Sequence, residues 1–242
     1  MISGPFFYYR KLLTLIIVLL AGGLSHAQDR TQEAAYINNK LQQVDSLIDI
    51  GEYDKANYQI NNTLNTFSFA RNSDDRLAFE FRIGRMYYQQ GQKEKAMQKL
   101  LNGLDRLKGS SNATLQIDFA NLLARIFADS QNFDKAIYYN KISLDRAKLS
   151  KDTVGITKAL IRLGSFYYAK NEEDSAKIFF RKVTYYPVTP KTEIRISNAY
   201  NNLGVIAQNN NNFLWPHHTG LQNDINYPNL HWSKLFPRYR SV

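Results

Sequence analysis

Apolar residues recur with helical spacing through most of the chain. In residues 77–90 they return three and four places apart, so they form one stripe on a helix of 3.6 residues per turn. Gly91 then supplies the left-handed backbone with which helices commonly end. A second helix is predicted over residues 95–104. The first stripe consists of Glu80, Ile83, Gly84 and Tyr87, and the second of Ala96, Leu100, Leu101 and Leu104.

This two-helix pattern returns along the chain. RIGRMYYQQGQKEKA at 82–96 is matched by RLGSFYYAKNEEDSA at 162–176, and LLARIFADSQNFDKA at 122–136 lies midway between them. Shorter matches occur at 47–60 and 201–213. Self-similarity at a fixed spacing of about 20–50 residues indicates a repeat architecture, because a single unit cannot bury its apolar stripe alone. Equivalent positions in successive repeats, here called slots, lie forty residues apart. The turn slot holds Gly51, Gly91, Gln131, Asn171 and Asn211. A small-residue slot holds Ala56, Ala96, Ala136 and Ala176, and a leucine slot holds Leu64, Leu104 and Leu144.

We therefore predict an all-α fold, a solenoid of stacked antiparallel helix hairpins with about four and a half repeats over residues 28–213. The small residues Gly84 and Ala96 are expected where the two helices of a hairpin approach closely. The predicted units lie near 37–76, 77–116, 117–156 and 157–196, with a partial unit at 197–213 and helix-breaking segments at 108–112, 150–152 and 186–190.

The unit resembles the tetratricopeptide repeat (TPR). The resemblance covers roughly residues 37–213 and rests on an aliphatic-Gly-x-x-Tyr segment, a turn glycine four residues later and an alanine five residues beyond it. The tryptophan slot of the family holds Glu80, Ala120 and Leu160 instead, and the period is 40 where the usual unit has about 34 residues. The longer unit is similar to repeats of bacterial envelope sensor and regulator proteins. The resemblance implies a non-catalytic scaffold that binds proteins or peptides, and it names no ligand.

The N-terminus has the features of an export signal. Arg10 and Lys11 precede thirteen mostly apolar residues at 12–24, and a small-residue motif then ends at Ala27. Such a run is too short to span about 30 Å of hydrocarbon at about 1.5 Å per residue. We predict that residues 1–27 are a signal peptide cleaved after Ala27 and that the mature chain, without a membrane span, reaches the bacterial periplasm or envelope or is secreted. An uncleaved segment that associates the protein with the membrane is the alternative.

The repeat pattern stops after Phe213. Pro216 takes the slot that holds alanine in the earlier units, and proline is not tolerated inside a helix. Residues 214–242 are therefore predicted to be an irregular tail, disordered or out of frame, with a basic-aromatic contact segment as the alternative. If the chain is truncated or frame-shifted here, the resemblance implies the input half of a longer protein with a membrane helix and an output domain.

Composition argues against catalysis. The chain of 242 residues is 44% hydrophobic and 21% charged, which is ordinary for a globular protein. Residues 28–213 contain neither histidine nor cysteine, so the commonest general base, metal ligand and thiol nucleophile are missing there. His217, His218 and His231 lie in the tail without the spacing of metal ligands. We expect no catalytic residue, no cofactor and no metal.

The net charge of the chain is positive, which favours acidic partners. With 31 Lys and Arg against 21 Asp and Glu, the chain carries +10, which favours nucleic acid, anionic lipid or acidic peptides. In the repeats that this chain resembles, first-helix residues pointing away from the packing stripe line a ligand groove. An acidic or C-terminal peptide suits such a row of guanidinium and amide groups. The candidate groove residues are Arg82, Arg85, Arg125, Lys158, Arg162, Asn198 and Asn202.

Three functional hypotheses follow. The first is a non-catalytic protein- or peptide-binding scaffold in the envelope, the sensing part of a signalling or regulatory protein. The second is a self-standing structural adaptor for envelope complexes. The third is a basic RNA-binding helical repeat protein, because the tyrosine pairs could also stack on bases; we expect no nucleic acid partner if the chain is exported.

Overall fold

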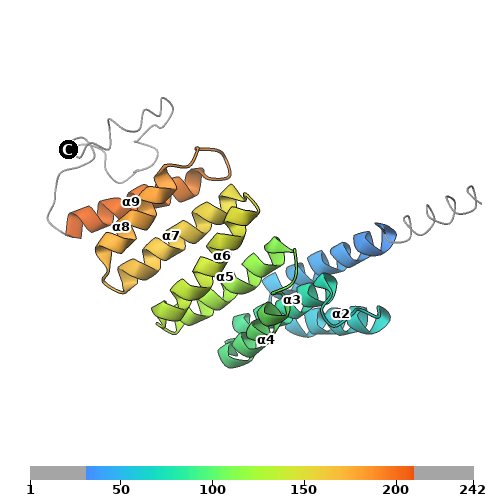
Figure 1. The fold of residues 1–242 in the computed structure, drawn as a ribbon. Helices are drawn as coiled ribbons and strands as arrows, with labels where there is room; N and C mark the ends of the chain where they lie inside the picture. Colours follow the sequence, from blue (N-terminus) through green and yellow to red (C-terminus); the bar gives the residue numbers. More distant parts are fainter. Residues whose placement is uncertain (1–30, 210–242) are drawn as a thin grey trace, which may run out of the picture. The chain divides into compact units, whose positions relative to one another are not determined.

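The computed structural model describes residues 31–209, and in this range the chain is helical and has no strand (Figure 1). The predicted all-α class is confirmed. The chain divides into two compact units, one ending at Arg82 and the other beginning at Ile83. The helices are residues 31–49, α2 (Tyr53–Thr66), α3 (Asp74–Gln89), α4 (Lys93–Arg106), α5 (Ala113–Asp129), α6 (Phe133–Leu149), α7 (Thr153–Ala169), α8 (Glu173–Thr184) and α9 (Glu193–Asn209).

The predicted signal segment and tail, residues 1–27 and 214–242, lie outside the described residues. Among the helices of residues 31–209, none is long and apolar enough to cross a membrane.

A left-handed residue ends the first helix of each hairpin. Gly51 and Gly91 have φ of +82° and +75°, a conformation that glycine adopts without steric cost. Gln131 and Asn171 take the same turn with φ of +55° and +61°. The turn slot predicted from the sequence is therefore confirmed at these four positions, including the two without glycine, and the fifth predicted position, Asn211, lies outside the described residues. The second helices begin two residues later, at Tyr53, Lys93, Phe133 and Glu173.

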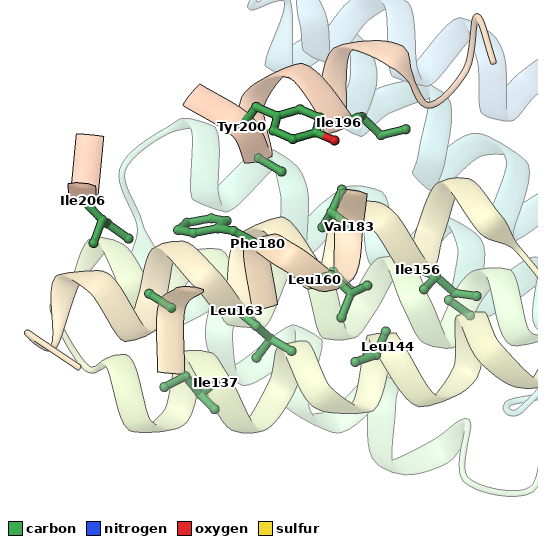
Figure 2. Close-up of a cluster of buried hydrophobic side chains, with 14 of the residues drawn as sticks. Ile137, Leu144, Ile156, Leu160, Leu163, Phe180, Val183, Ile196, Tyr200 and Ile206 are labelled. Carbon is green, nitrogen blue, oxygen red and sulfur yellow. The ribbon is translucent and has the colours of Figure 1, made fainter. Parts of the chain in front are cut away.

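In the second unit, successive helices pack against one another from α4 to α9, as Figure 1 shows for α5–α9. We call α3, α5, α7 and α9 the first helices, and α4, α6 and α8 the second helices. Contact between α7 and α9 joins two first helices directly. Figure 2 shows the apolar side chains that fill the space between α6, α7, α8 and α9. They include Ile137, Leu144, Ile156, Leu160, Leu163, Phe180, Val183, Ile196, Tyr200 and Ile206.

Small residues lie where paired helices approach closely, as predicted. A Cβ atom added to Gly84 would lie 2.9 Å from the Leu100 side chain. At Gly164 the added atom would lie 2.4 Å from the ring of Phe180. Real Cβ atoms do not approach other atoms so closely, so both glycines are required by packing. The alanine slot is fully buried at Ala56, Ala96, Ala136 and Ala176.

The slot that holds tryptophan in the typical TPR is a packing position here too. Ala120 and Leu160 are buried, and Glu80 is only 6% exposed. Nε of Arg76 lies 3.2 Å from a carboxylate oxygen of Glu80, one turn along α3. A buried carboxylate needs such a partner, because an isolated charge would be expensive to remove from water.

Candidate protein-binding surface

Positive side chains gather on the first helices of the second unit. Although much of Lys158 on α7 is exposed, partial burial lowers the pKa of its ammonium group. The neighbouring charges of Arg162 and Arg195 lower this pKa further, whereas the carboxylates of Asp118 and Asp152 oppose them. Like charges therefore lie close enough here to disfavour one another. We define the basic face as Arg125 of α5, Lys158 and Arg162 of α7, and Arg195 of α9.

Arg162 is held by a neutral partner. Its Nη1 donates a hydrogen bond of 2.8 Å to Oδ1 of Asn121 on α5. Burial lowers the pKa of the Arg162 guanidinium, and the positive charge of Arg125 lowers it further. An amide oxygen fixes the guanidinium in place but carries no net charge. Arg125 and Arg162 are therefore a pair of like charges on adjacent first helices.

The first unit carries an ion pair in the corresponding slots. Arg82 of α3 forms an ion pair with Asp45, thirty-seven residues earlier, the same separation as between Arg162 and Arg125. The Arg82 guanidinium also donates to the carbonyl oxygens of Leu41 at 3.3 Å and Ala78 at 3.0 Å. Arg82 is thus neutralised within its own unit, whereas the equivalent pair in the second unit holds two positive charges.

Arg125 is exposed and is positioned by an aromatic ring. Its guanidinium carbon lies 5.2 Å from the ring centroid of Tyr88, within the range of a cation–π interaction. The Tyr88 hydroxyl donates a hydrogen bond to Asp129 on α5. Burial and this hydrogen bond raise the pKa of Tyr88, and Arg125 opposes the rise. The Arg125 side chain is nevertheless exposed to solvent.

The remaining predicted groove residues lie on two first helices. Arg85 is half-buried on α3, Asn198 is exposed on α9 and Asn202 is half-buried on α9. Arg125 lies close enough to Arg162, and Arg162 close enough to Lys158, for their charges to influence one another. The complete groove of seven residues stays a prediction.

Sequence reasoning missed Asn121 and Arg195. Asn121 precedes Arg125 by four residues, and Arg195 precedes Asn198 by three, so each shares a helix face with a predicted residue. Extending the predicted face by one turn towards each helix N-terminus would have found both. Asp118 lies forty residues before Lys158, in the same repeat slot, and its carboxylate partly offsets the charge of the basic face.

No constellation for metal chemistry lies in the described part of the chain. Within residues 31–209, no three His, Cys, Asp or Glu side chains are grouped so that they could hold a metal ion. The histidines of the tail fall outside this range.

Comparison with known proteins finds solved structures with a similar fold. No family model and no curated protein sequence matches this chain. Solved structures do match. A putative kinesin light chain from Podosopora anserina, described as having nearly identical TPR-like repeats, has a TM-score of 0.56 and 13% identity over 69% of this chain and 87% of that chain. A variant form of that same protein has a TM-score of 0.56 and 14% identity over 69% of this chain and 86% of that one.

BtubC (BKLC) from P. vanneervenii covers more of the molecule. It is 17% identical and has a TM-score of 0.57, over 85% of this chain and 87% of its own. At such low identity the likeness concerns the fold alone. The chain has a TPR-type repeat fold, which confirms the resemblance seen in the sequence.

Proposed function

We propose that this protein is a non-catalytic scaffold that binds an acidic or C-terminal peptide segment of a partner protein on the basic face. The observation that carries the proposal is the like-charge pair of Arg125 and Arg162, in slots where the first unit has the ion pair of Asp45 and Arg82. Two neighbouring guanidinium groups repel each other in the free protein. A carboxylate bound near them would relieve that repulsion.

Burial decides how much each contact contributes. Arg162 is half-buried, so a carboxylate bonded to it would contribute about 1.5–3 kcal/mol, as hydrogen bonds to charged groups do. Arg125 is exposed, so its contribution would be less than about 1 kcal/mol. Arg162 therefore anchors the ligand, and Arg125, Lys158 and Arg195 select for negative charge.

We further propose that the protein acts in the bacterial envelope as the sensing part of a signalling or regulatory protein. The support is the signal-like segment at residues 1–27 and the resemblance to envelope sensor proteins. Mass spectrometry of the protein purified from a bacterial host tests the export step. Loss of residues 1–27 is expected, and a cytosolic full-length product would refute export and favour the RNA-binding alternative.

The binding proposal is tested with the full chain and a fluorescent acidic peptide that ends in a free carboxylate. Arg125→Asp restores the charge pattern of the Asp45–Arg82 pair, so we expect affinity to fall about thirtyfold, or about 2 kcal/mol, from one lost contact and neutralisation of Arg162. Thermal stability should change by less than about 1 kcal/mol, since a new ion pair offsets the lost stacking on Tyr88.

Lys141→Asp on α6 is the matched control, because it makes the same change in net charge at an exposed second-helix position. We expect it to weaken binding less than threefold. An equal loss in both variants would mean that only the net charge attracts the peptide. Tighter binding of a single-stranded RNA of equal charge than of the peptide would instead support the nucleic-acid alternative.

A further inference from the structure

Two opposite charges lie one helical turn apart on α5, at the basic face. Arg125 and Asp129 are both exposed, and a spacing of four residues puts their side chains on the same side of the helix. The Asp129 carboxylate accepts a hydrogen bond from the Tyr88 hydroxyl. Burial and this hydrogen bond raise the pKa of Tyr88, so the hydroxyl stays neutral and does not cancel the charge of Asp129. An ionised carboxylate has about four acceptor sites, so Asp129 can accept from a second donor as well.

The stability of α5 does not account for a negative charge at this position. Asp129 is the last residue of α5, and an anionic side chain is unfavourable at the negative end of the helix macrodipole. Eighty residues later, Nδ2 of Asn209 occupies the same slot and donates a hydrogen bond of 2.8 Å to the hydroxyl of Tyr168. On that helix the slot of Arg125 holds Val205. The contact between adjacent first helices thus forms there without charged residues, so packing does not require the charges of Arg125 and Asp129.

The spacing of these two charges matches an extended peptide. Side chains four residues apart on a helix have Cβ atoms about 5–6 Å apart. Alternate side chains of an extended chain lie on one side, about 6.6–6.8 Å apart, because each residue advances about 3.3–3.4 Å. We infer that the peptide bound at the basic face is extended and carries a basic residue two positions from its acidic residue, with the carboxylate near Arg125 and the cation at Asp129. This inference rests on the proposed function and specifies the charge pattern of its ligand.

Three fluorescent peptides of equal length test the charge pattern with the full chain. Each ends in glutamate with a free carboxylate, and the two residues before this glutamate are Ala-Ala, Lys-Ala or Ala-Lys in otherwise uncharged sequences. Net charge alone predicts that lysine weakens binding, because the protein carries +10. We expect instead that the Lys-Ala peptide binds about two- to fivefold more tightly than the other two, as one exposed ion pair allows. Fluorescence anisotropy measures the three affinities.

Asp129→Asn isolates the contribution of the carboxylate. The amide keeps an acceptor for the Tyr88 hydroxyl and resembles the neutral pair of Tyr168 and Asn209, so the variant should fold like the natural chain. In this variant the Lys-Ala peptide should bind no more tightly than the Ala-Ala peptide. Asp145→Asn on α6 is the matched control, because it removes one negative charge at an exposed second-helix position. The control should keep the preference for the Lys-Ala peptide.

The outcomes separate this inference from the proposed function. If the natural chain binds the Lys-Ala peptide no more tightly than the Ala-Ala peptide, while Arg125→Asp still weakens binding of the Ala-Ala peptide, the inference fails and the proposed function stands. A lysine preference that survives Asp129→Asn would overturn the role of Asp129. An equal gain from the Ala-Lys peptide would overturn the extended geometry. If none of the three peptides shows saturable binding, the proposed function fails, and this inference fails with it.

Discussion

Alanine substitutions at two equivalent glycines should change stability in opposite directions. At Gly204 nothing lies within 4 Å of the added Cβ atom, so Gly204→Ala should stabilise the protein by about 0.5–1 kcal/mol through the higher helix propensity of alanine. At Gly164 the same propensity gain is present, but the added atom would lie 2.4–2.8 Å from three ring atoms of Phe180. Phe180 is 2% exposed, so a shift of its ring would disturb the core around it.

Overpacking of this kind typically costs about 1–3 kcal/mol. After subtraction of the propensity gain, Gly164→Ala should destabilise by about 1–2 kcal/mol. The free energies of unfolding of the two variants should therefore differ by about 2 kcal/mol, although the chemical change and the position in the repeat are the same. Urea unfolding followed by far-UV circular dichroism measures the difference. With a slope of about 2 kcal/mol per molar urea, the midpoints should differ by about 1 M on opposite sides of the natural sequence.

Gly164→Leu should destabilise more than Gly164→Ala, since the larger side chain needs a larger displacement of the covering helix. If Gly164→Ala is as stable as the natural sequence, the close packing of α7 and α8 is wrong. If Gly204→Ala is destabilising, another element covers Gly204.

Further predictions concern three polar groups. Asn140 is fully buried and donates a hydrogen bond to the carbonyl oxygen of Ala159. Asn140→Asp should therefore destabilise the protein by about 3 kcal/mol at pH 7, and stability should recover as the pH falls and the carboxyl is protonated. A loss of stability that does not depend on pH would contradict this reasoning. Gln116 is buried and donates to two carbonyl oxygens of the segment before α5, so Gln116→Leu should cost about 1–3 kcal/mol and speed amide exchange in residues 108–112; unchanged exchange would argue against this role. Arg162→Gln removes a positive charge that lowers the pKa of Lys158. The pKa of Lys158, measured by NMR titration, should therefore rise in this variant. An unchanged pKa would mean that the charges of the two side chains do not interact.

The fold was predictable because its features repeat. Gly91 alone could have been any turn glycine, but its register with Gln131 and Asn171 predicts left-handed turns at two positions where the residue type gives a weak signal. The same register predicts the close approaches at Gly84 and Gly164. Helices and turns can be predicted from the local sequence. Their packing partners can be predicted only because the same pattern returns, which shows that similar units stack on one another.

The open slot at Gly204 could not be predicted in this way. The sequence repeats the glycine, and repetition alone favours the same burial as at Gly164. The difference arises from the second helix that covers each glycine, and α9 has no such helix within residues 31–209. A slot therefore specifies the shape of a surface, whereas burial depends on the element that meets it.

The same distinction explains why the charged surface was only partly predictable. A repeat slot fixes the helix face on which a side chain lies, and for this reason Arg82, Arg125 and Arg162 were all candidates for one groove. Their availability to a ligand depends on the partner in the neighbouring helix, which varies between units. Asp45 neutralises Arg82, whereas Asn121 holds Arg162 without cancelling its charge. The slot of Asp45 is filled by Arg125 eighty residues later, so the repeat fixes the position of this neighbour but not the sign of its charge. A neutral amide beside Arg162, with Arg125 nearby, costs electrostatic repulsion that the first unit avoids. This repulsion in the free protein is physically reasonable if an anionic segment of a partner binds beside the two arginines and offsets their charge.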